Sequence, residues 1–489
     1  MYFSPYFVLT IIVAYFALLV VISWLTTRRL EVDSFYLGNR RNPWYVIAIG
    51  MIGSSISGIT FISVPGMVGA SQFSYLQMVA GFVVGYIVVA QVLLPLYYRL
   101  NLTSIYAYLG QRFGTGAYKT GASFFLISRL LGSAIRLLVV SVVLQTLVFD
   151  KLGIPFYINV IFTVLLIFVY TNKGGIKTII WTDLLQTLVL LATLVLTIYG
   201  VASYLDLSWH GVVQTVWHSD LSRTLFLDNP ADKRYFWKQF LAGAFTVITM
   251  TGLDQDLMQK NLSCKNLREA KRNMRCYGIV FLPVNLLFLS LGVLLLTFMN
   301  NNGITAPSHP DQIFPMIATS GYLPAVIGVF FVIGITAAAY SSADSALAAL
   351  TTSFTIDILG LKNDDALLQT KRKIVHLGFS LLFIVLILLV RALDNGSLIN
   401  TVYRVASYTY GPLLGLFSFG LFTKMQVRDR WVPLVALLAP VLSWLLNAIS
   451  PHLFNGYQFG FELLIVNGLL TFIGLWCIRK PYERLARAD

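Results

Sequence analysis

The chain has little charge, few histidines and almost no cysteine. Only 11% of its 489 residues are Asp, Glu, Lys or Arg, whereas soluble domains carry about a quarter, so a soluble globular domain is excluded. The five histidines lie mostly in or near loops, without HExxH spacing, and neither a GxSxG elbow nor a GxxxxGK[ST] loop occurs. Three cysteines, Cys264, Cys276 and Cys477, imply no disulfide framework. These absences argue against an enzyme and against P-loop ATP hydrolysis.

Long apolar runs dominate what remains. The chain is 57% hydrophobic with a mean hydropathy of +0.75, and runs of about 20 residues are long enough to cross a bilayer as helices. We therefore expect an all-α polytopic membrane protein. About thirteen spanning helices are predicted, beginning near residues 6, 44, 73, 121, 155, 178, 236, 277, 322, 374, 396, 431 and 460.

The net charge of +14 follows the predicted topology. With the N-terminus outside, most of the 35 Lys and Arg fall on the cytoplasmic side, in clusters such as Arg28-Arg29, Arg40-Arg41, the Lys260–Arg275 segment, Lys371–Lys373 and the Arg479–Arg487 tail. This is a positive-inside bias rather than a nucleic-acid patch. It predicts a multi-pass protein of the cell (inner) membrane, with the C-terminus cytoplasmic and with no nucleic-acid partner or obligate protein partner. The first apolar stretch, residues 6–25, reads as a retained helix because it lacks a basic n-region and a cleavage site.

One apolar helix, Val332–Asp357, turns polar at its centre. Ala338, Ser341, Ser342 and Ser345 share one helical stripe, and Asp344 lies on its flank. A carboxylate and three hydroxyls at bilayer depth need a partner, and a small cation is the simplest one. This stretch predicts an ion site.

Two other predicted spans are interrupted by small and polar residues. Met51–Gly66 is rich in Gly and Ser, which predicts unwinding at mid-membrane with freed carbonyls, although small-residue helix packing would give a similar composition. Gly243–Leu262 is interrupted in the same way, and a loop at residues 173–175 and a kink at Gly411-Pro412 are also expected. Interrupted helices five spans apart indicate an inverted five-helix repeat within a single domain, 1–489. The repeats would cover about 44–204 and 236–422, with peripheral helices in 1–30 and 423–489.

Charged residues inside the predicted spans leave alternatives open. Arg129 and Arg136 share one helix face; Arg129 either snorkels to the cytoplasmic surface or is functional, while the deeper Arg136 is expected to be functional. Asp183 is either a hydrated interfacial carboxylate or an ion ligand. Arg404 is either an interfacial anchor or part of a site.

A sodium ion suits the oxygens that the two interrupted stretches supply. Sodium is a hard cation that takes about five or six oxygens. The hydroxyls of Ser341 and Ser342 and the carbonyl of Ala338 would supply one side, and the carbonyls of Gly53 and Ile56 the other. Neutral oxygens bind weakly enough for a transported ion to leave.

Residues 31–422 resemble the sodium:solute symporters related to the sodium/glucose cotransporters. The motifs are DSFYLGNRRNPW, SSISGITFISVPG, GGIKTIIWTDLLQ, TGLDQDLMQK and AAAYSSADSALAALTTSFTIDI. The resemblance implies a LeuT-type fold, sodium-driven alternating access and a substrate site at mid-membrane. It implies a sodium site at Gly53, Ile56, Ala338, Ser341 and Ser342, and a second, found in some members, at Ser341, Asp344, Ser345 and Asp183.

The substrate positions depart from those of the sugar-binding members. Where those members place Glu or Asn, this chain has Leu76, Gln77 and Val247, with Arg404 nearby. Together with Arg136 this favours a carboxylate, which a guanidinium binds bidentately. We expect a sodium-coupled symporter of a small organic solute, leaning toward a sugar acid or monocarboxylate; a neutral-solute symporter and a non-transporting membrane sensor are the alternatives. The expected substrate residues are Ser57, Thr60, Gln77, Arg136, Met250 and Arg404, and Na+ is the only expected cofactor.

Overall fold

A computed structural model describes residues 4–27, 40, 42–307, 309–319, 321–361, 368–393, 398–454 and 456–480. Within these ranges the regular structure is helical, and the only strand-like pairings are two isolated β-bridges, Asn42 with Cys264 and Val427 with Arg479. The expectation of an all-α protein is confirmed.

The main helices, in chain order, are as follows. They are α1 (Pro5–Thr27), α3 (Trp44–Ser55), α4 (Gly58–Gly66), α5 (Val68–Ser71), α6 (Tyr75–Val88), α7 (Leu94–Arg99), α8 (Ala107–Arg112), α9 (Thr115–Leu144), α10 (Phe156–Tyr204), α11 (Trp209–Trp217), α12 (Phe236–Val247), α13 (Gln255–Leu262), α14 (Leu267–Asn301), α15 (Ile313–Thr319), α16 (Ala325–Ser353), α17 (Leu368–Leu393), α18 (Leu398–Thr409), α19 (Gly411–Phe422), α20 (Val432–Leu453) and α21 (Leu463–Cys477). A π-helical turn, η7 (Ile248–Gly252), follows α12.

The described helices are long and apolar enough for a multi-pass membrane protein. Eight of them could each cross a membrane, or up to ten spans if each of two bent pairs counts as one, and Phe156–Thr171 and Leu463–Cys477 are shorter apolar helices. The expected count of thirteen stays a prediction.

The helix interruptions expected from the sequence are present. The α3–α4 pair is bent by 58° around Ile56 and Ser57, and the α18–α19 pair by 45° just before Gly411-Pro412. The second interrupted stretch divides into α12, η7 and α13, with Asp254 in an extended conformation at the start of α13. Gly, Ser and Pro weaken or remove helical hydrogen bonds at these points.

The prediction of a loop at residues 173–175 was wrong. Helix α10 is assigned without interruption from Phe156 to Tyr204, and its two apolar stretches, Phe156–Thr171 and Thr178–Tyr204, flank the Lys-Gly-Gly sequence. Glycine disfavours a helix by only about 1 kcal/mol and keeps its N–H donor, so two glycines without a proline do not end one.

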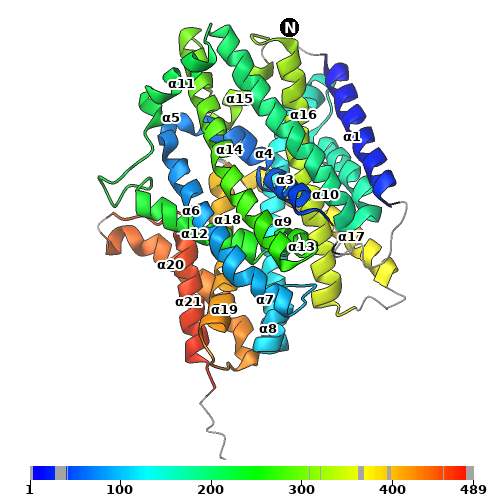
Figure 1. Cartoon of the computed structure of the whole chain (residues 1–489), viewed down its shortest axis with the longest axis vertical. Helices are drawn as coiled ribbons and strands as arrows, with labels where there is room; N and C mark the ends of the chain where they lie inside the picture. The colour runs from blue at the N-terminus through cyan, green and yellow to red at the C-terminus, as the bar shows by residue number, and fades with distance from the viewer. Residues whose placement is uncertain are drawn as a thin grey trace, which may run out of the picture.

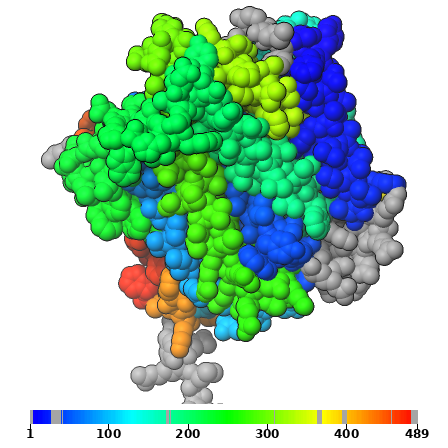
Figure 2. All heavy atoms as spheres, turned by 45° about the horizontal axis from the view of Figure 1, so that its top comes forward, coloured from blue at the N-terminus to red at the C-terminus, as the bar shows by residue number. Residues whose placement is uncertain are grey.

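The middle of the molecule is formed by α3, α9, α10 and α16 (Figure 1). Helix α16 packs along α10 and α9, and α3 packs on α10. Gly53 permits this second contact, because a Cβ there would lie 2.1 Å from Thr187 Oγ1. Helix α1 covers the outside of α10 at one edge of the molecule, and α20 and α21 lie at the other side (Figures 1 and 2). The broken helix α3–α4 therefore meets α10 and α16 in the interior.

Candidate ion and solute sites

The break between α3 and α4 frees backbone oxygens. The Ile56 N–H donates to the Ile52 carbonyl at 2.8 Å, and the next turn starts where the Phe61 N–H donates to the Ser57 carbonyl at 3.0 Å. Between these bonds the carbonyls of Gly53 and Ile56 accept no backbone hydrogen bond from a described residue. Free carbonyls inside a membrane protein are suited to coordinating a cation.

Helix α16 presents the Ser341 hydroxyl toward this break. Ser341 Oγ lies 3.5 Å from Ser54 Oγ at the end of α3. Ser342 Oγ is buried and has no hydrogen-bond partner in the part of the chain that the structure describes. Because an unsatisfied buried hydroxyl costs about 1–3 kcal/mol, Ser342 is suited to a ligand that arrives from outside. Ala338, one turn before Ser342, is also buried.

Asp183 on α10 orients Ser341. The Ser341 hydroxyl donates to Asp183 Oδ1 at 2.5 Å. A hydroxyl has one proton and two lone pairs, so this donation leaves the oxygen free to accept a cation. Outer groups that fix a ligand in this way tune a metal site. The oxygens of Gly53, Ile56, Ala338, Ser341 and Ser342 are neutral, and they are of the kind that a hard monovalent cation such as sodium takes.

The structure does not bring the four residues of the expected second sodium site together. Asp344 accepts from the Tyr170 hydroxyl at 2.8 Å and from the backbone N–H of Ser345 at 2.5 Å. The Ser345 hydroxyl donates instead to Asp256 at 2.9 Å. Among the described residues the expected ligands thus form two contacting pairs, Ser341 with Asp183 and Asp344 with the Ser345 backbone, while the Ser345 hydroxyl is directed to Asp256.

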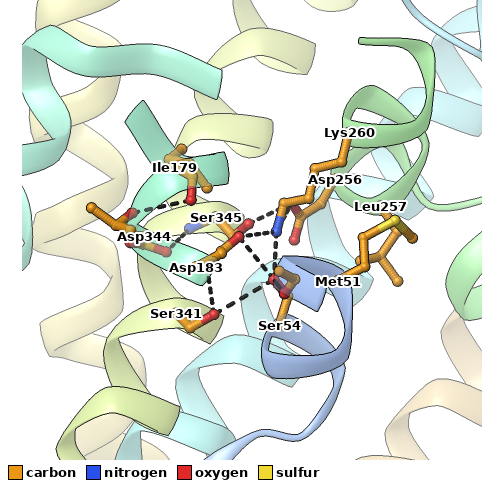
Figure 3. A network of polar contacts seen from close by, with 12 residues as sticks. Met51, Ser54, Ile179, Asp183, Asp256, Leu257, Lys260, Ser341, Asp344 and Ser345 are labelled. Atoms are coloured by element: carbon orange, nitrogen blue, oxygen red, sulfur yellow. Dashed lines mark hydrogen bonds and ion pairs between the residues drawn. The ribbon is translucent and has the colours of Figure 1, made fainter. Parts of the chain in front are cut away.

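The Lys260 ammonium contacts the oxygens around Asp183 (Figure 3). Its Nζ lies 2.7 Å from Asp183 Oδ2, 2.6 Å from Ser54 Oγ and 3.9 Å from Asp256 Oδ1, and its side chain is buried. Placing Lys260 in a cytoplasmic loop was wrong, because its polar neighbours Gln259 and Asn261 lower the hydropathy of a segment that is in fact interior. The helical spacing of Asp256 and Lys260 was the available signal.

Arg129 belongs to the same buried network. Its guanidinium bonds to Asp256 and lies 3.9 Å from Asp254, which also accepts from the Tyr410 hydroxyl at 2.6 Å. Its side chain is only 4% exposed, so the snorkelling alternative is wrong. The paired charges link α9 to α13 and, through Tyr410, to the α18–α19 break. Nothing in the sequence shows which of the two arginines of α9 is the one paired with Asp256.

A cavity of about 80 Å³ lies beside the α3–α4 break, enough for several water-sized molecules or one small solute. Four of the six expected substrate residues line it: Ser57, Thr60, Arg136 and Met250. Sequence reasoning missed most of its aromatic and hydroxyl wall. That wall comprises Tyr75, Phe82, Tyr86, Thr246, Thr251, Tyr277, Phe281 and Tyr403.

Arg136 is half-buried and differs from the buried Arg129 and Lys260 in having no hydrogen-bond or ion-pair partner among the described residues. It lines the cavity from α9, and no hydrogen bond or ion pair joins it to another described residue. The ion pairs of the described interior involve Arg129 and Lys260 instead. A guanidinium that lines a cavity and has no hydrogen-bond or ion-pair partner among the described residues is suited to an anionic ligand.

Gln77 and Arg404 do not line the cavity. The Gln77 amide donates to the Arg234 carbonyl at 2.8 Å and accepts from the Phe226 N–H at 3.2 Å, so it holds the segment between α11 and α12 in place. In that segment Arg234 hydrogen-bonds Asp232 and holds the pKa of its carboxyl below the usual value. Arg404 is exposed, whereas its neighbour Tyr403 reaches the cavity.

Interrupted helices that meet beside an interior cavity define a multi-pass membrane protein of the LeuT-type architecture. The sodium:solute symporter family matches residues 35–428, and the chain belongs to this family. The resemblance noted in the sequence is thereby confirmed.

Several relatives are carriers. The chain is 24% identical to the sodium/iodide cotransporter of Homo sapiens (80% of this chain, 61% of the relative). It is 28% identical to the sodium-coupled monocarboxylate transporter 1 of Mus musculus (79% and 64%). It is 24% identical to the sodium/sialic acid symporter NanT of Aliivibrio fischeri (93% and 90%). The chain thus spans about three fifths of the two animal relatives and most of the bacterial one.

Solved structures agree with the fold. A substrate-bound, outward-open Na+-coupled sialic acid symporter aligns with a TM-score of 0.81 at 20% identity, over 97% of this chain and 98% of that one. The nucleobase-cation-symport-1 transporter Mhp1, in a closed conformation, aligns with a TM-score of 0.56 at 15% identity, over 90% and 93%. At these identities the likeness establishes the architecture alone.

Proposed function

We propose that this protein is a sodium-coupled symporter that imports a small organic anion bearing a carboxylate. The observation that carries the proposal is the Arg136 guanidinium, which lines the cavity and has no hydrogen-bond or ion-pair partner in the described part of the chain. A charge held in a membrane interior without a counter-charge is unfavourable, and an incoming carboxylate would supply one.

The cavity walls suit a small acid. Ser57 and Thr60, next to the helix break, offer hydroxyls, and the Tyr75 and Tyr403 hydroxyls lie 3.1 Å apart across α6 and α18. Phe82 and other aromatic rings supply an apolar face. The combination fits a carboxylate next to a short carbon chain with hydroxyl or carbonyl groups, and relatives of this chain include monocarboxylate and sialic acid carriers.

Sodium coupling follows from the shared helix break. Gly53 and Ile56 would hold sodium through their carbonyls, while Ser57 and Thr60, just beyond the break, line the solute cavity. An ion that orders this backbone also orders the solute site, so each ligand raises the affinity of the other. The proposal includes the orientation with the N-terminus outside and the C-terminus cytoplasmic.

The test is uptake of labelled lactate, pyruvate and sialic acid into proteoliposomes, with sodium or choline outside. We expect sodium-dependent uptake of at least one acid and competition by other carboxylates. Equal uptake in choline would overturn sodium coupling. Competition by glucose or proline but not by any carboxylate would favour a neutral-solute symporter, for which the hydroxyl-rich wall is the supporting feature. Absence of transport for all solutes, together with ligand-dependent thermal stabilisation, would indicate a sensor.

A further inference from the structure

The buried oxygens around Asp183 form a cation site of their own. Asp183, Ser54 and Ser341 come from three helices, α10, α3 and α16, and contact one another: Ser54 Oγ is 3.0 Å from Asp183 Oδ2, and Ser341 donates to Oδ1. All three are buried. A carboxylate with two hydroxyls is an oxygen set that suits a monovalent cation.

In this structure the cation that contacts these oxygens is a side chain of the protein, the Lys260 ammonium. Lys260 Nζ lies 2.7 Å from Asp183 and 2.6 Å from Ser54, and Asp256 is 3.9 Å away on the same helix, α13 (Figure 3). An ammonium is a compact single positive charge with three donors, so it satisfies the same oxygens that a sodium ion would.

We propose that Lys260 is a tethered cation that fills the place of a second sodium ion, so that this carrier binds one sodium ion per cycle. The inference rests on the proposed sodium coupling and deepens it by setting the number of ions. A sodium ion at Asp183 would lie in contact with the ammonium, and two like charges at that separation repel strongly in a buried site.

The lysine also supports the site at the helix break. Its ammonium neutralises Asp183, which in turn accepts the Ser341 proton and leaves the Ser341 oxygen available. The charge that a second sodium ion would deliver and remove in each cycle is here permanently attached to α13. Energy from the sodium gradient then enters through one ion only.

The experiment counts sodium ions on the purified full-length protein by equilibrium binding of radioactive sodium, which requires no knowledge of the solute. We expect one ion per protein in the wild type. Lys260→Ala removes the ammonium and leaves Asp183, Ser54 and Ser341, so the count rises to two. Lys260→Gln, which retains a hydrogen-bonding side chain, serves as a second variant, with the same expectation.

Matched variants separate this site from the first. Lys265→Ala, at an exposed lysine five residues further on, should stay at one ion. Adding Asp183→Asn to Lys260→Ala should return the count to one, and adding Ser342→Ala to Lys260→Ala should leave the ion held by Asp183.

Two ions on the wild type would overturn the inference even if the Lys260 variants fail to fold. A count of one in folded Lys260→Ala and Lys260→Gln would also overturn it. No sodium binding in the wild type would instead contradict the proposed function, so the two failures are distinguishable.

Discussion

Arg129 and Arg136 lie two turns apart on the same face of α9 and both line the cavity, yet they differ in their partners. Arg129 is paired with Asp256 and approaches Asp254, so its charge is balanced within the protein. Arg136 lines the solute cavity and has no such partner among the described residues. The difference teaches that a charge in a membrane helix has to be judged by what faces it. A satisfied arginine holds helices together, whereas an unsatisfied one awaits a ligand.

The largest effect should come from removing the paired arginine. Arg129→Gln leaves Asp254 without its ion-pair partner and Asp256 with only Lys260, at 3.9 Å, and breaking a buried pair in this way costs about 3–5 kcal/mol. We expect a clear fall in the thermal melting temperature of the detergent-purified protein. A melting temperature equal to that of the wild type would remove the basis for treating Arg129 as structural.

Arg136→Gln should not lower the melting temperature but should impair transport. It removes a charge that has no ion-pair partner among the described residues, so the melting temperature without solute should stay the same or rise. Carboxylate uptake should fall about 100-fold, since losing one partner of a buried charged contact costs roughly 2–5 kcal/mol. Arg404→Gln is the matched control, because Arg404 is exposed, and its uptake should stay near that of the wild type. Equal losses of carboxylate uptake in Arg136→Gln and Arg404→Gln would contradict a specific role for Arg136 in the cavity.

Ser342→Ala tests the ion half of the site. Losing one ligand oxygen of the expected five or six should raise the sodium concentration for half-maximal uptake about 10-fold, or about 1.4 kcal/mol, with little change in the maximal rate. Thr352→Val, which removes another unpaired buried hydroxyl further along α16, is the control. A shift of similar size in the control would place the sodium ion elsewhere.

Gln77→Ala should have the smallest effect. Its amide holds the segment between α11 and α12 through hydrogen bonds to Arg234 and Phe226. Without the amide, backbone hydrogen exchange in that segment should rise several-fold. Half-saturation by the solute should change by less than about threefold, since Gln77 lies outside the cavity. A loss of solute uptake as large as that in Arg136→Gln would show that Gln77 contacts the solute.

Much of the fold was predictable from the sequence because its signals are local. Gly and Ser clusters predicted the break at Ile56, and Gly411-Pro412 predicted the bend between α18 and α19. The serines of α16 predicted an ion site because hydroxyls are unusual at bilayer depth. The continuous α10 was missed, since two glycines weaken a helix without ending it.

The errors at the site have a common physical cause. Each residue turns a helix by about 100°, so a small error in helical phase selects Arg404 instead of Tyr403. Whether Arg129 or Arg136 is paired depends on Asp254 and Asp256, which lie over a hundred residues away in sequence. Such contacts are set by packing, and one sequence gives no sign of them.

The most direct test compares an acid with its amide. Lactate and lactamide have nearly the same shape but differ in charge, and counterflow in sodium-loaded proteoliposomes measures how well each competes with the labelled solute. If Arg136 selects a carboxylate, lactate should compete far better than lactamide in the wild type, and the preference should disappear in Arg136→Gln. Equal competition by the two compounds in the wild type, or an unchanged preference in the variant, would contradict a carboxylate site at Arg136.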